Sequence, residues 1–540
     1  MTSSLLFHMV EVLNPAVFDN IHAELHKLFD VVAERARVGG DVIFFQIGRY
    51  MMYFRYLVDI ALLIFYYIYN HTVVHYYAKE MVLEFMIWEG EAIMNDLNYK
   101  ESSYNFEFPY EDDESKRILY NSRTNALALI DKEKYTYFQN FKERGQPISD
   151  EKLLEDLKHG GYILRDDIDE LELIRFNLLQ SRYNTSSLGL TIAPTSDCNF
   201  RCIYCYEKES LKPVVMSGGV QEKVVELVKA RAESIMRLSV TWYGGEPLLA
   251  LDIIENLTNK FLEICEEHKI RYDAGIVTNG YLLTTKVAER LKDLRITHTQ
   301  ITVDGAPEEH DKRRPLAGGQ PTFHKIISNL RAAKEILPCK VSIRINTDKD
   351  NADQVDEVLK ILKENDLNDV AYPYLGMVEN SNDCYAESSC YHPEEFSAVE
   401  YDYRIRNSSD ISNSYPRLIA NSCGADSNSN LVINADGKLY KCWNDIGVEE
   451  RTVGDLLAPA SDAAMVPLLQ YLMYDPTHDS ECSKCKYLPS CMGGCPSRRL
   501  FRKDTRCNVM RYRLKDYICV ISLYLKNNKI KPANKDDDVA

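Results

Sequence analysis

The sequence contains no apolar run long enough to cross a membrane. The nearest candidate is Tyr50–Tyr69, which includes Arg55 and Asp59, and its uninterrupted apolar part, Ile60–Tyr69, has only ten residues. A bilayer span needs about 18 to 20 residues, so this segment is predicted to be a buried or partner-facing helix. The first residues also lack the basic start, short apolar run and small-residue cleavage site of an export signal. We therefore expect a cytoplasmic protein without a transmembrane span.

A surplus of positive charge is also missing. Lys and Arg number 64 against 81 Asp and Glu, which gives a formal net charge of −17. Such a chain has little electrostatic attraction to phosphate backbones, so we expect no nucleic-acid partner. Hydrophobic residues make up 45% and charged residues 27% of the chain. This ordinary globular mixture excludes a mainly disordered chain and a collagen.

Cysteine is present in unusual number, at 15 of 540 residues, and most of these cysteines lie in clusters. In a large chain without an export signal, cysteines bind metal or do chemistry more often than they form structural disulfides. Cys265, Cys339 and Cys519 lie outside the clusters and are predicted to be small buried apolar residues.

The part of the chain before the first cysteine cluster divides into two regions. Residues 1–115 are predicted to be a helical N-terminal extension, to which the sequence assigns no role. Residues 116–185 change to a small module of strands and helices, with a hairpin predicted from Ile118–Tyr120 and Ala126–Ile130. This module is predicted either as a winged-helix-like fold that binds peptide or as a prefix that packs on the next domain.

Residues 186–385 alternate apolar strands with amphipathic helices. The predicted strands are Leu188–Ala193, Leu238–Tyr243, Gly275–Thr278, Gln300–Val303, Val341–Asn346 and Val370–Tyr374. Six βα repeats predict an α/β fold with a parallel sheet, most simply an open, partial (β/α)6 TIM-like barrel whose chemistry lies at the carboxyl ends of the strands. Residues 386–525 form a cysteine-rich, loop-rich domain, and the polar tail 526–540 is predicted to be disordered.

The first cysteine cluster follows the first predicted strand directly, as Cys198-x3-Cys202-x2-Cys205. Three thiolates on one short loop can hold three irons of a [4Fe–4S] cluster and leave the fourth iron without a protein ligand. An open metal position is typical of a reactive site. A closed zinc site is the alternative, but no fourth Cys or His lies nearby at the usual spacing.

This loop resembles the signature of the radical S-adenosylmethionine (SAM) enzymes. The resemblance implies that SAM binds the open iron and that its cleavage gives a 5′-deoxyadenosyl radical. Gly244-Gly245-Glu246-Pro247 follows the second strand and resembles the family's GGEP motif, which holds the SAM amino group. Thr302 and Arg344, near the ends of later strands, are carried over as contacts of the SAM carboxylate and ribose.

The second cluster has the spacing Cys423-x13-Gly437-x4-Cys442, a gap of 39 residues, and then a compact block of five cysteines. That block is Cys482-x2-Cys485-x5-Cys491-x3-Cys495-x11-Cys507. Taken alone, it would also suit a zinc ribbon. Together, the seven cysteines resemble a SPASM domain, which carries two auxiliary [4Fe–4S] clusters.

The resemblance assigns these seven cysteines to two ligand sets: Cys423, Cys442 and Cys495 for the first auxiliary cluster, and Cys482, Cys485, Cys491 and Cys507 for the second. The position where a fourth ligand of the first set often lies is Arg417 here. Either Cys384 or Cys390 supplies the missing ligand, or one iron is open to a substrate thiolate. The expected cofactors are thus three [4Fe–4S] clusters and SAM.

Radical SAM enzymes with SPASM domains mostly modify peptides, so the resemblance implies a ribosomal-peptide (RiPP) maturase. Its expected partners are a precursor peptide with a leader and a low-potential flavodoxin or ferredoxin. We expect thioether formation between a cysteine sulfur and a carbon, with carbon–carbon crosslinking or oxidation of a Cys or Ser, as in anaerobic sulfatase maturation, as alternatives. The sulfatase-type oxidation is the weaker hypothesis for one reason. The sulfatase-maturing enzymes carry Asp directly after the cysteine that matches Cys442, whereas this chain has Trp443 there. A non-catalytic iron–sulfur or zinc scaffold is a remote alternative.

Overall fold

The computed structural model describes residues 98–337, 341–408, 411–502 and 507–528, which belong to one compact unit that begins at Asn98. The helical extension predicted for residues 1–97, together with Cys339 and residues 529–540, lies outside the described residues. Within these ranges, no helix is both long and apolar enough to span a bilayer.

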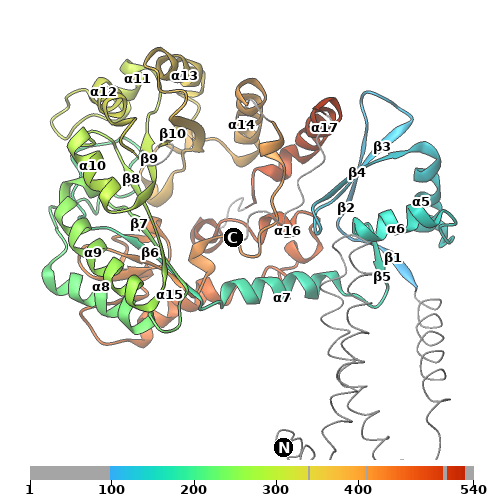
Figure 1. The fold of residues 1–540 in the computed structure, drawn as a ribbon, viewed down its shortest axis with the longest axis horizontal. Helices are drawn as coiled ribbons and strands as arrows, with labels where there is room; N and C mark the ends of the chain where they lie inside the picture. The colour runs from blue at the N-terminus through green and yellow to red at the C-terminus, as the bar shows by residue number, and fades with distance from the viewer. Residues whose placement is uncertain (1–97, 338–340, 409–410, 503–506, 529–540) are drawn as a thin grey trace, which may run out of the picture. The chain divides into compact units, whose positions relative to one another are not determined.

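Six parallel strands form the centre of the fold, as predicted (Figure 1). They are β6 (Ser187–Ile192), β7 (Arg237–Trp242), β8 (Arg271–Thr278), β9 (Ile296–Thr302), β10 (Val341–Thr347) and β11 (Ala371–Met377). Their order in the sheet is β11-β10-β9-β8-β7-β6, and β6 pairs on its other side with a later strand rather than with β11. The barrel is therefore open.

Helices connect these strands and lie along the outer face of the curved sheet (Figure 1). They are α8 (Gly218–Arg231), α9 (Leu251–His268), α10 (Thr285–Asp293), α11 (Pro307–Arg313), α12 (Phe323–Ala333) and α13 (Val355–Glu364). A turn of 3-10 helix, η1 (Pro247–Ala250), precedes α9. Each crossover returns the chain to the start of the next parallel strand, so all six carboxyl ends meet at one mouth.

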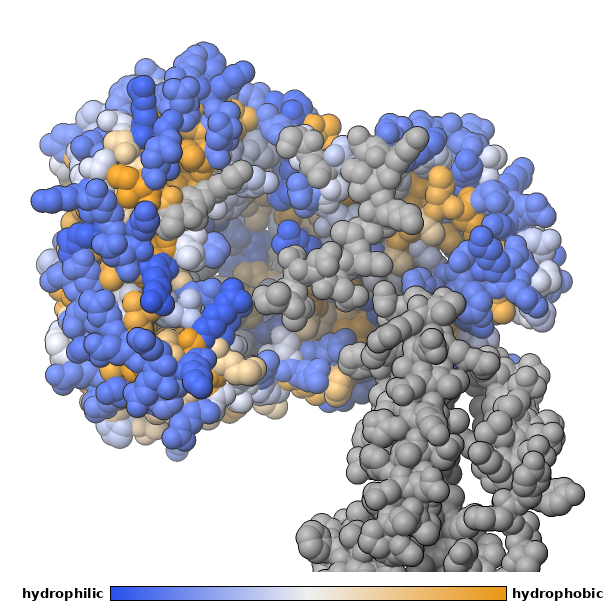
Figure 2. Space-filling model, viewed as in Figure 1, coloured by the Kyte–Doolittle hydropathy of each residue, from blue (hydrophilic) through white to orange (hydrophobic). Residues whose placement is uncertain are grey.

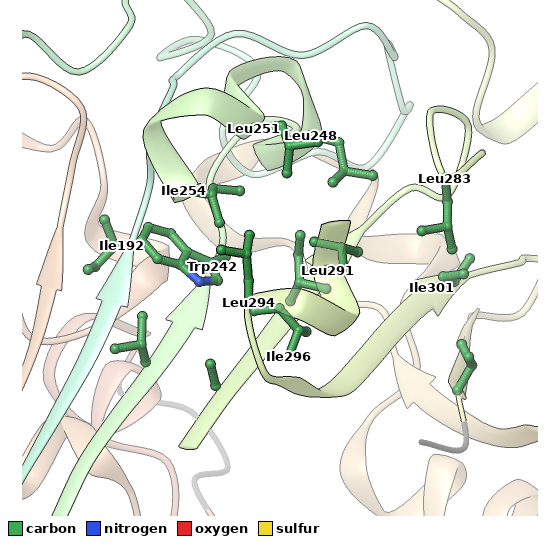
Figure 3. Close-up of a cluster of buried hydrophobic side chains, with 14 of the residues drawn as sticks. Ile192, Trp242, Leu248, Leu251, Ile254, Leu283, Leu291, Leu294, Ile296 and Ile301 are labelled. Carbon is green, nitrogen blue, oxygen red and sulfur yellow. The ribbon is translucent and has the colours of Figure 1, made fainter. Parts of the chain in front are cut away.

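The main core lies between this sheet and its helices. Burial alternates along β6, where Leu188, Leu190 and Ile192 are buried and the residues between them are half-buried. This period of two places the apolar side chains on the helix-covered face. Trp242 at the end of β7 is fully buried in the same cluster, and Figure 3 shows it beside Ile192 and Ile254 of α9.

The cysteine-rich region continues the sheet of the barrel. Its strand β12 (Asn430–Ile433) pairs in parallel with β6 and antiparallel with β13 (Lys438–Tyr440), which pairs with β14 (Gly454–Asp455). Its helices are α14 (Pro393–Asn407), α15 (Asp462–Leu472), α16 (Leu488–Cys491) and α17 (Met510–Asn528). The segment just before β12 lies beside the residues that precede β6, because the Asn428 N–H donates to the carbonyl of Arg182 (2.8 Å). The predicted disordered tail begins too early, since α17 continues through Lys526 to Asn528.

The module before the barrel contains β1 (Tyr99–Glu101), β2 (Asn105–Pro109), β3 (Lys116–Asn121), β4 (Ala126–Asp131), α5 (Lys132–Arg144), α6 (Glu151–His159), β5 (Ile163–Arg165) and α7 (Glu170–Arg182). The predicted hairpin is present as β3 and β4, and β2 completes a three-stranded antiparallel sheet. The predicted helix up to residue 115 is wrong for its described part, which contains β1 and β2. Phe106 of β2 packs on Tyr120 of β3 and on Tyr487, and these aromatic contacts favour a strand there.

This module rests on the cysteine-rich region. The Lys486 ammonium donates to the carbonyl of Asn105 (2.8 Å), the Asn125 amide donates to the carbonyl of Pro416 (2.8 Å), and the Tyr415 hydroxyl donates to the carbonyl of Asn125 (2.9 Å). The surface shown in Figure 2 is mostly hydrophilic, with hydrophobic residues in scattered places, as is usual for a folded protein in water.

Candidate functional site at the barrel mouth

The first cysteine loop leaves the carboxyl end of β6 and carries Cys198, Cys202 and Cys205, each of them partly buried. The Cys198 N–H donates to Oδ1 of Asp197 (2.8 Å), and the Phe200 N–H donates to Sγ of Cys198 (3.4 Å). These short-range bonds fold the loop back on itself. The structure thus places the three predicted cysteines together where the barrel carries its chemistry.

The three thiols are close enough for their charges to interact. Burial raises the pKa of Cys198, Cys202 and Cys205, to about 12 for Cys205, and the charges of Cys202 and Cys205 add to the rise at Cys198. Without metal these groups are protonated thiols. Binding of iron would displace the protons, because the thiolate is the form that ligates metal.

The GGEP segment lies directly against this loop. A Cβ on Gly245 would stand 2.1 Å from the carbonyl oxygen of Asp197 and 3.2 Å from the amide nitrogen of Cys198. Gly244 has a φ of +104°, a conformation that side-chain-bearing residues rarely adopt. The Glu246 N–H donates to the carbonyl of Asp197 (2.8 Å). Both glycines are therefore required for the close approach of the two loops.

The Glu246 carboxylate is fully buried and braces two strand ends. Its Oε1 accepts hydrogen bonds from the Thr278 hydroxyl (2.7 Å) and the Leu248 N–H (3.0 Å), and its Oε2 accepts one from the Asn279 N–H (2.8 Å). Burial raises the pKa of this carboxyl, and the three hydrogen bonds oppose the rise. Because both oxygens are engaged within the protein, the side chain holds Thr278 and Asn279 at the mouth. The Asn279 amide in turn donates to Oδ1 of Asn199 (2.7 Å) on the cysteine loop.

Replacing Glu246 by Gln is expected to weaken this brace. In either amide orientation the new NH2 group faces a backbone N–H, of Asn279 or of Leu248, and one buried donor is left without an acceptor. Such a loss costs about 1–3 kcal/mol. We expect a lower midpoint in anaerobic thermal unfolding and weaker SAM binding by equilibrium dialysis. Glu222→Gln on the exposed side of α8 is the matched control, and equal effects of the two variants would contradict the assignment.

The later strand ends carry the other predicted contacts. Thr302 is the buried last residue of β9 and is paired in register with Arg344 of β10. The Arg344 Nε–H donates to Oδ1 of Asn346 (2.6 Å), and its guanidinium lies over the Tyr374 ring (5.9 Å). Pro247 is buried at the start of η1. These residues share the end of the barrel that holds the cysteine loop.

Sequence reasoning missed a buried polar network beneath the loop. The Tyr204 hydroxyl contacts the Asp304 carboxylate and accepts hydrogen bonds from Arg314 (2.7 Å) and from the Asn346 amide (3.0 Å). Arg313 forms a two-pronged ion pair with Asp348 (3.2 and 2.8 Å). The position of Tyr204 between Cys202 and Cys205 was its one local signal, since all of its partners come from distant segments.

The seven cysteines of the second motif fall into two groups in space. Besides burial, the charges of Cys423 and Cys495 raise the pKa of Cys442. Likewise, burial and the charges of Cys507, Cys482 and Cys485 raise the pKa of Cys491. This grouping agrees with the two ligand sets that the resemblance to a SPASM domain implies.

Four described cysteines belong to none of these three groups: Cys265, Cys384, Cys390 and Cys519. The Cys384 thiol donates to the carbonyl of Tyr204 (3.3 Å), beside the first cysteine loop, and the Cys390 thiol contacts the carbonyl of Ala386 (3.6 Å). The largest influences on the pKa of these two thiols come from burial and from residues other than Cys423, Cys442 and Cys495. Cys265 and Cys519 are buried, as predicted.

The donor set at the barrel mouth fits an iron–sulfur cluster that also binds SAM. Three buried thiols are grouped on one loop, and glycine backbone without side chains lies against them. Among the described residues, no three His, Cys, Asp or Glu side chains are arranged to hold a single metal ion. A [4Fe–4S] cluster does not need such convergence, since each cysteine binds a different iron.

Comparison with known proteins agrees with this chemistry. Residues 192–362 match the Radical SAM superfamily. The chain is 26% identical over 363 residues to a cysteine-type anaerobic sulfatase-maturating enzyme of Clostridium perfringens, covering 60% of this chain and 93% of that protein. It is 24% identical over 346 residues to the enzyme of the same name from Clostridium novyi, covering 57% and 88%. A probable GTP 3′,8-cyclase of Archaeoglobus fulgidus is 30% identical over 188 residues, covering 34% and 57%.

Among solved structures, the chain is similar to anSMEcpe with bound AdoMet, at a TM-score of 0.49 and 20% identity over 64% of this chain and 96% of that one. It is also similar to Streptococcus suis SuiB bound to the precursor peptide SuiA, at a TM-score of 0.42 and 18% identity over 76% and 99%. The matched segment, residues 192–362, identifies the chain as an enzyme of the Radical SAM superfamily, which implies a [4Fe–4S] cluster and SAM as cofactors.

Proposed function

We propose that this enzyme is a peptide maturase that removes a hydrogen atom from a ribosomally made peptide and installs a thioether crosslink. The observation that carries the proposal is the grouping of ten motif cysteines into three sets, one at the barrel mouth and two in the cysteine-rich region. The clostridial relatives that align over 57–60% of this chain are named as maturating enzymes, which supports a peptide or protein substrate.

Cys198, Cys202 and Cys205 hold the reactive cluster in this proposal. The cluster and SAM, when bound, supply the 5′-deoxyadenosyl radical that abstracts hydrogen from the substrate. The protein positions the cofactor through the Gly244–Gly245 backbone, which approaches the cysteine loop closely, and through the Glu246 brace behind it. The absence of side chains at these two glycines lets the GGEP segment pack against the backbone of the cysteine loop and so fixes the position of that loop.

Thr302 and Arg344 are proposed to contact the SAM carboxylate and ribose. They lie opposite each other on neighbouring strands near the mouth, and Arg344 carries the positive charge that a carboxylate would need. Its guanidinium is held by Asn346 and by the Tyr374 ring. These contacts restrict its rotamers before the cofactor binds.

The two groups in the cysteine-rich region are proposed as auxiliary cluster sites. The first has three cysteines, Cys423, Cys442 and Cys495, and the second has four, Cys482, Cys485, Cys491 and Cys507. The placement of Cys384 beside Tyr204 favours a first auxiliary set of three protein thiols. A three-thiol set leaves one iron position for a substrate sulfur, which is what thioether formation would use.

Oxidation of the anaerobic sulfatase-maturing type is the second candidate, because the relatives' names favour it. The surroundings of Asp445, the acidic residue nearest to Cys442, speak against that chemistry. Asp445 is fully buried and accepts hydrogen bonds from Tyr471 (2.6 Å) and Arg451 (3.2 Å). Trp443 is half-exposed instead and stacks on Tyr243 at the end of β7, with ring centroids 5.3 Å apart. An apolar ring cannot act as a base.

The module of residues 98–185 is proposed to bind the leader of the precursor peptide. Its sheet has the order β2-β3-β4, so β4 is an edge strand within the described residues. An extended peptide can add to such an edge through backbone hydrogen bonds. The Leu129 side chain on β4 is exposed and would lie beside the added strand.

The proposal is tested with the full chain after anaerobic reconstitution. We expect about twelve irons per chain for three clusters and release of deoxyadenosine from SAM with a chemical reductant. A pool of synthetic cysteine-containing peptides is then added. A thioether product has lost two hydrogen atoms and no longer reacts with iodoacetamide.

The same assay separates the alternatives. A carbon–carbon crosslink loses the same mass but leaves the thiol reactive, whereas a sulfatase-type product carries an aldehyde that a hydrazide probe labels. The matched control is the same pool with each Cys replaced by Ser, which cannot form a thioether. About four irons with SAM cleavage would remove the auxiliary clusters from the proposal, and zinc without cleavage would overturn it.

A further inference from the structure

We propose that Arg314 is a positioning residue that lies beside the Cys202 ligand and raises the reduction potential of the SAM-binding cluster. This inference rests on the proposed function, in which Cys202 holds one iron of that cluster. No local motif marks Arg314, which lies at the C-terminal end of α11, far along the chain from the cysteine loop.

Backbone pairing places Arg314 directly opposite Cys202. The Arg201 N–H donates to the carbonyl of Pro315 (2.9 Å), and the Ile203 N–H donates to the carbonyl of Arg313 (3.0 Å). An antiparallel bridge between Phe200 and Leu316 continues the same register. In an antiparallel pair, directly opposed residues point to the same face with their Cβ atoms about 4.5–5.5 Å apart. Cys202 and Arg314 are such a pair.

The Arg314 guanidinium is buried, and no carboxylate of the described residues forms a hydrogen bond with it. Its relative exposure is 7%, and its Nη1 donates to the Tyr204 hydroxyl (2.7 Å). Oδ2 of Asp304 lies 3.9 Å from its Nη1, beyond hydrogen-bonding distance. Within the described residues its Nε has no acceptor. A buried N–H without a partner is costly, and a sulfur atom of the bound cluster would be a suitable acceptor.

The pKa shifts of Arg314 and Cys202 agree with their placement opposite each other. Burial alone would lower the pKa of Arg314, but the charges of Cys202, Tyr204 and Asp304 more than offset it, and the guanidinium stays protonated. Burial raises the pKa of Cys202, and the charge of Arg314 is the largest opposing influence. A thiolate at Cys202 and the cation at Arg314 therefore stabilise each other.

The consequence for the cluster follows from its charge. Reduction adds one negative charge, which a buried cation and a hydrogen bond to a ligand sulfur stabilise more than they stabilise the oxidised form. In the low-dielectric surroundings of Phe200, whose ring lies 5.7 Å from the guanidinium carbon, this effect is larger than in water. Arg314 thus makes the cluster easier for a low-potential protein reductant to reduce.

The test is a redox titration of the reconstituted full chain, followed by electron paramagnetic resonance. The signal that changes when SAM is added identifies the cluster with the open iron. For Arg314→Met we expect a more negative midpoint potential of this cluster. The ratio of reduced to oxidised cluster at a fixed potential should fall about tenfold, which corresponds to about 59 mV for one electron. Arg314→Lys keeps the charge without the planar N–H array and is expected to shift the midpoint less, in the same direction.

Arg201→Met is the matched control on the same loop. Its guanidinium donates to the carbonyls of Cys198 (2.6 Å) and Phe200 (2.7 Å) but is exposed, so solvent screens its charge. We expect Arg201→Met to change the midpoint potential of the cluster less than Arg314→Lys does. An unchanged or more positive midpoint in Arg314→Met, with normal iron content, would overturn the inference.

Two further outcomes separate a failure of the inference about Arg314 from a failure of the proposed function. If Arg314→Met does not retain its iron, the Arg314→Lys midpoint decides, and an unchanged value there also overturns the inference. If SAM alters no cluster signal in the unmodified enzyme, the proposed function itself fails, irrespective of Arg314.

Discussion

Replacing Cys198 by Ala is expected to reduce SAM cleavage to background and to remove about four irons per chain. Cys198 lies closest to the barrel strand among the three loop cysteines, and its Sγ accepts a hydrogen bond from the Phe200 N–H. Alanine offers neither a metal ligand nor an acceptor. The two remaining thiols would hold a cluster poorly, because each iron without a protein ligand is exposed to exchange.

The measurement combines iron and acid-labile sulfide analysis with deoxyadenosine assays on the same anaerobic sample. The auxiliary groups are separate in space, so their iron is expected to remain. Cys265→Ala is the matched control, because Cys265 is a buried cysteine in α9 outside all three groups. Deoxyadenosine production by Cys198→Ala at the rate of the control would refute the ligand assignment.

Replacing Gly245 by Ala is expected to lower deoxyadenosine formation about a hundredfold, the scale that a displacement of about 1 Å can cost an active site. The new Cβ would lie 2.1 Å from the Asp197 carbonyl oxygen, and its three nearest neighbours are all backbone atoms, which cannot rotate away. The two loops must therefore separate. Separation would stretch the bond from the Glu246 N–H to that carbonyl and move Cys198 from its place.

Gly218→Ala is the control for this change. Gly218 is in the first turn of α8, and a Cβ there would meet no atom within 4 Å. Alanine favours helix over glycine, so we expect unchanged activity and a slightly higher unfolding temperature. SAM binding by equilibrium dialysis, measured beside the rate, locates the defect. Equal activity of Gly245→Ala and Gly218→Ala would contradict the close approach of the two loops.

The errors of the sequence-based prediction have local physical causes. Residues 98–115 were predicted as the end of a helical segment, yet β2 forms because Phe106 packs on Tyr120 and Tyr487. Its partner Tyr487 is far along the chain, and no pattern within a short window reports such a contact. The hydrogen bonds of the Glu246 carboxylate were not predicted for a similar reason, since its partners include Thr278 and Asn279 from the next strand end.

The sequence alone determined the parallel sheet, the order of its six strands along the chain and the loops that carry the cysteines. These features follow from short-range periodicity and spacing, which a chain expresses before it folds. Only the tertiary structure decided that Cys384 lies beside Tyr204, that Trp443 stacks on Tyr243, and that Arg314 is opposite Cys202. Such contacts depend on the register and packing of distant segments, where burial fixes which polar groups must find one another.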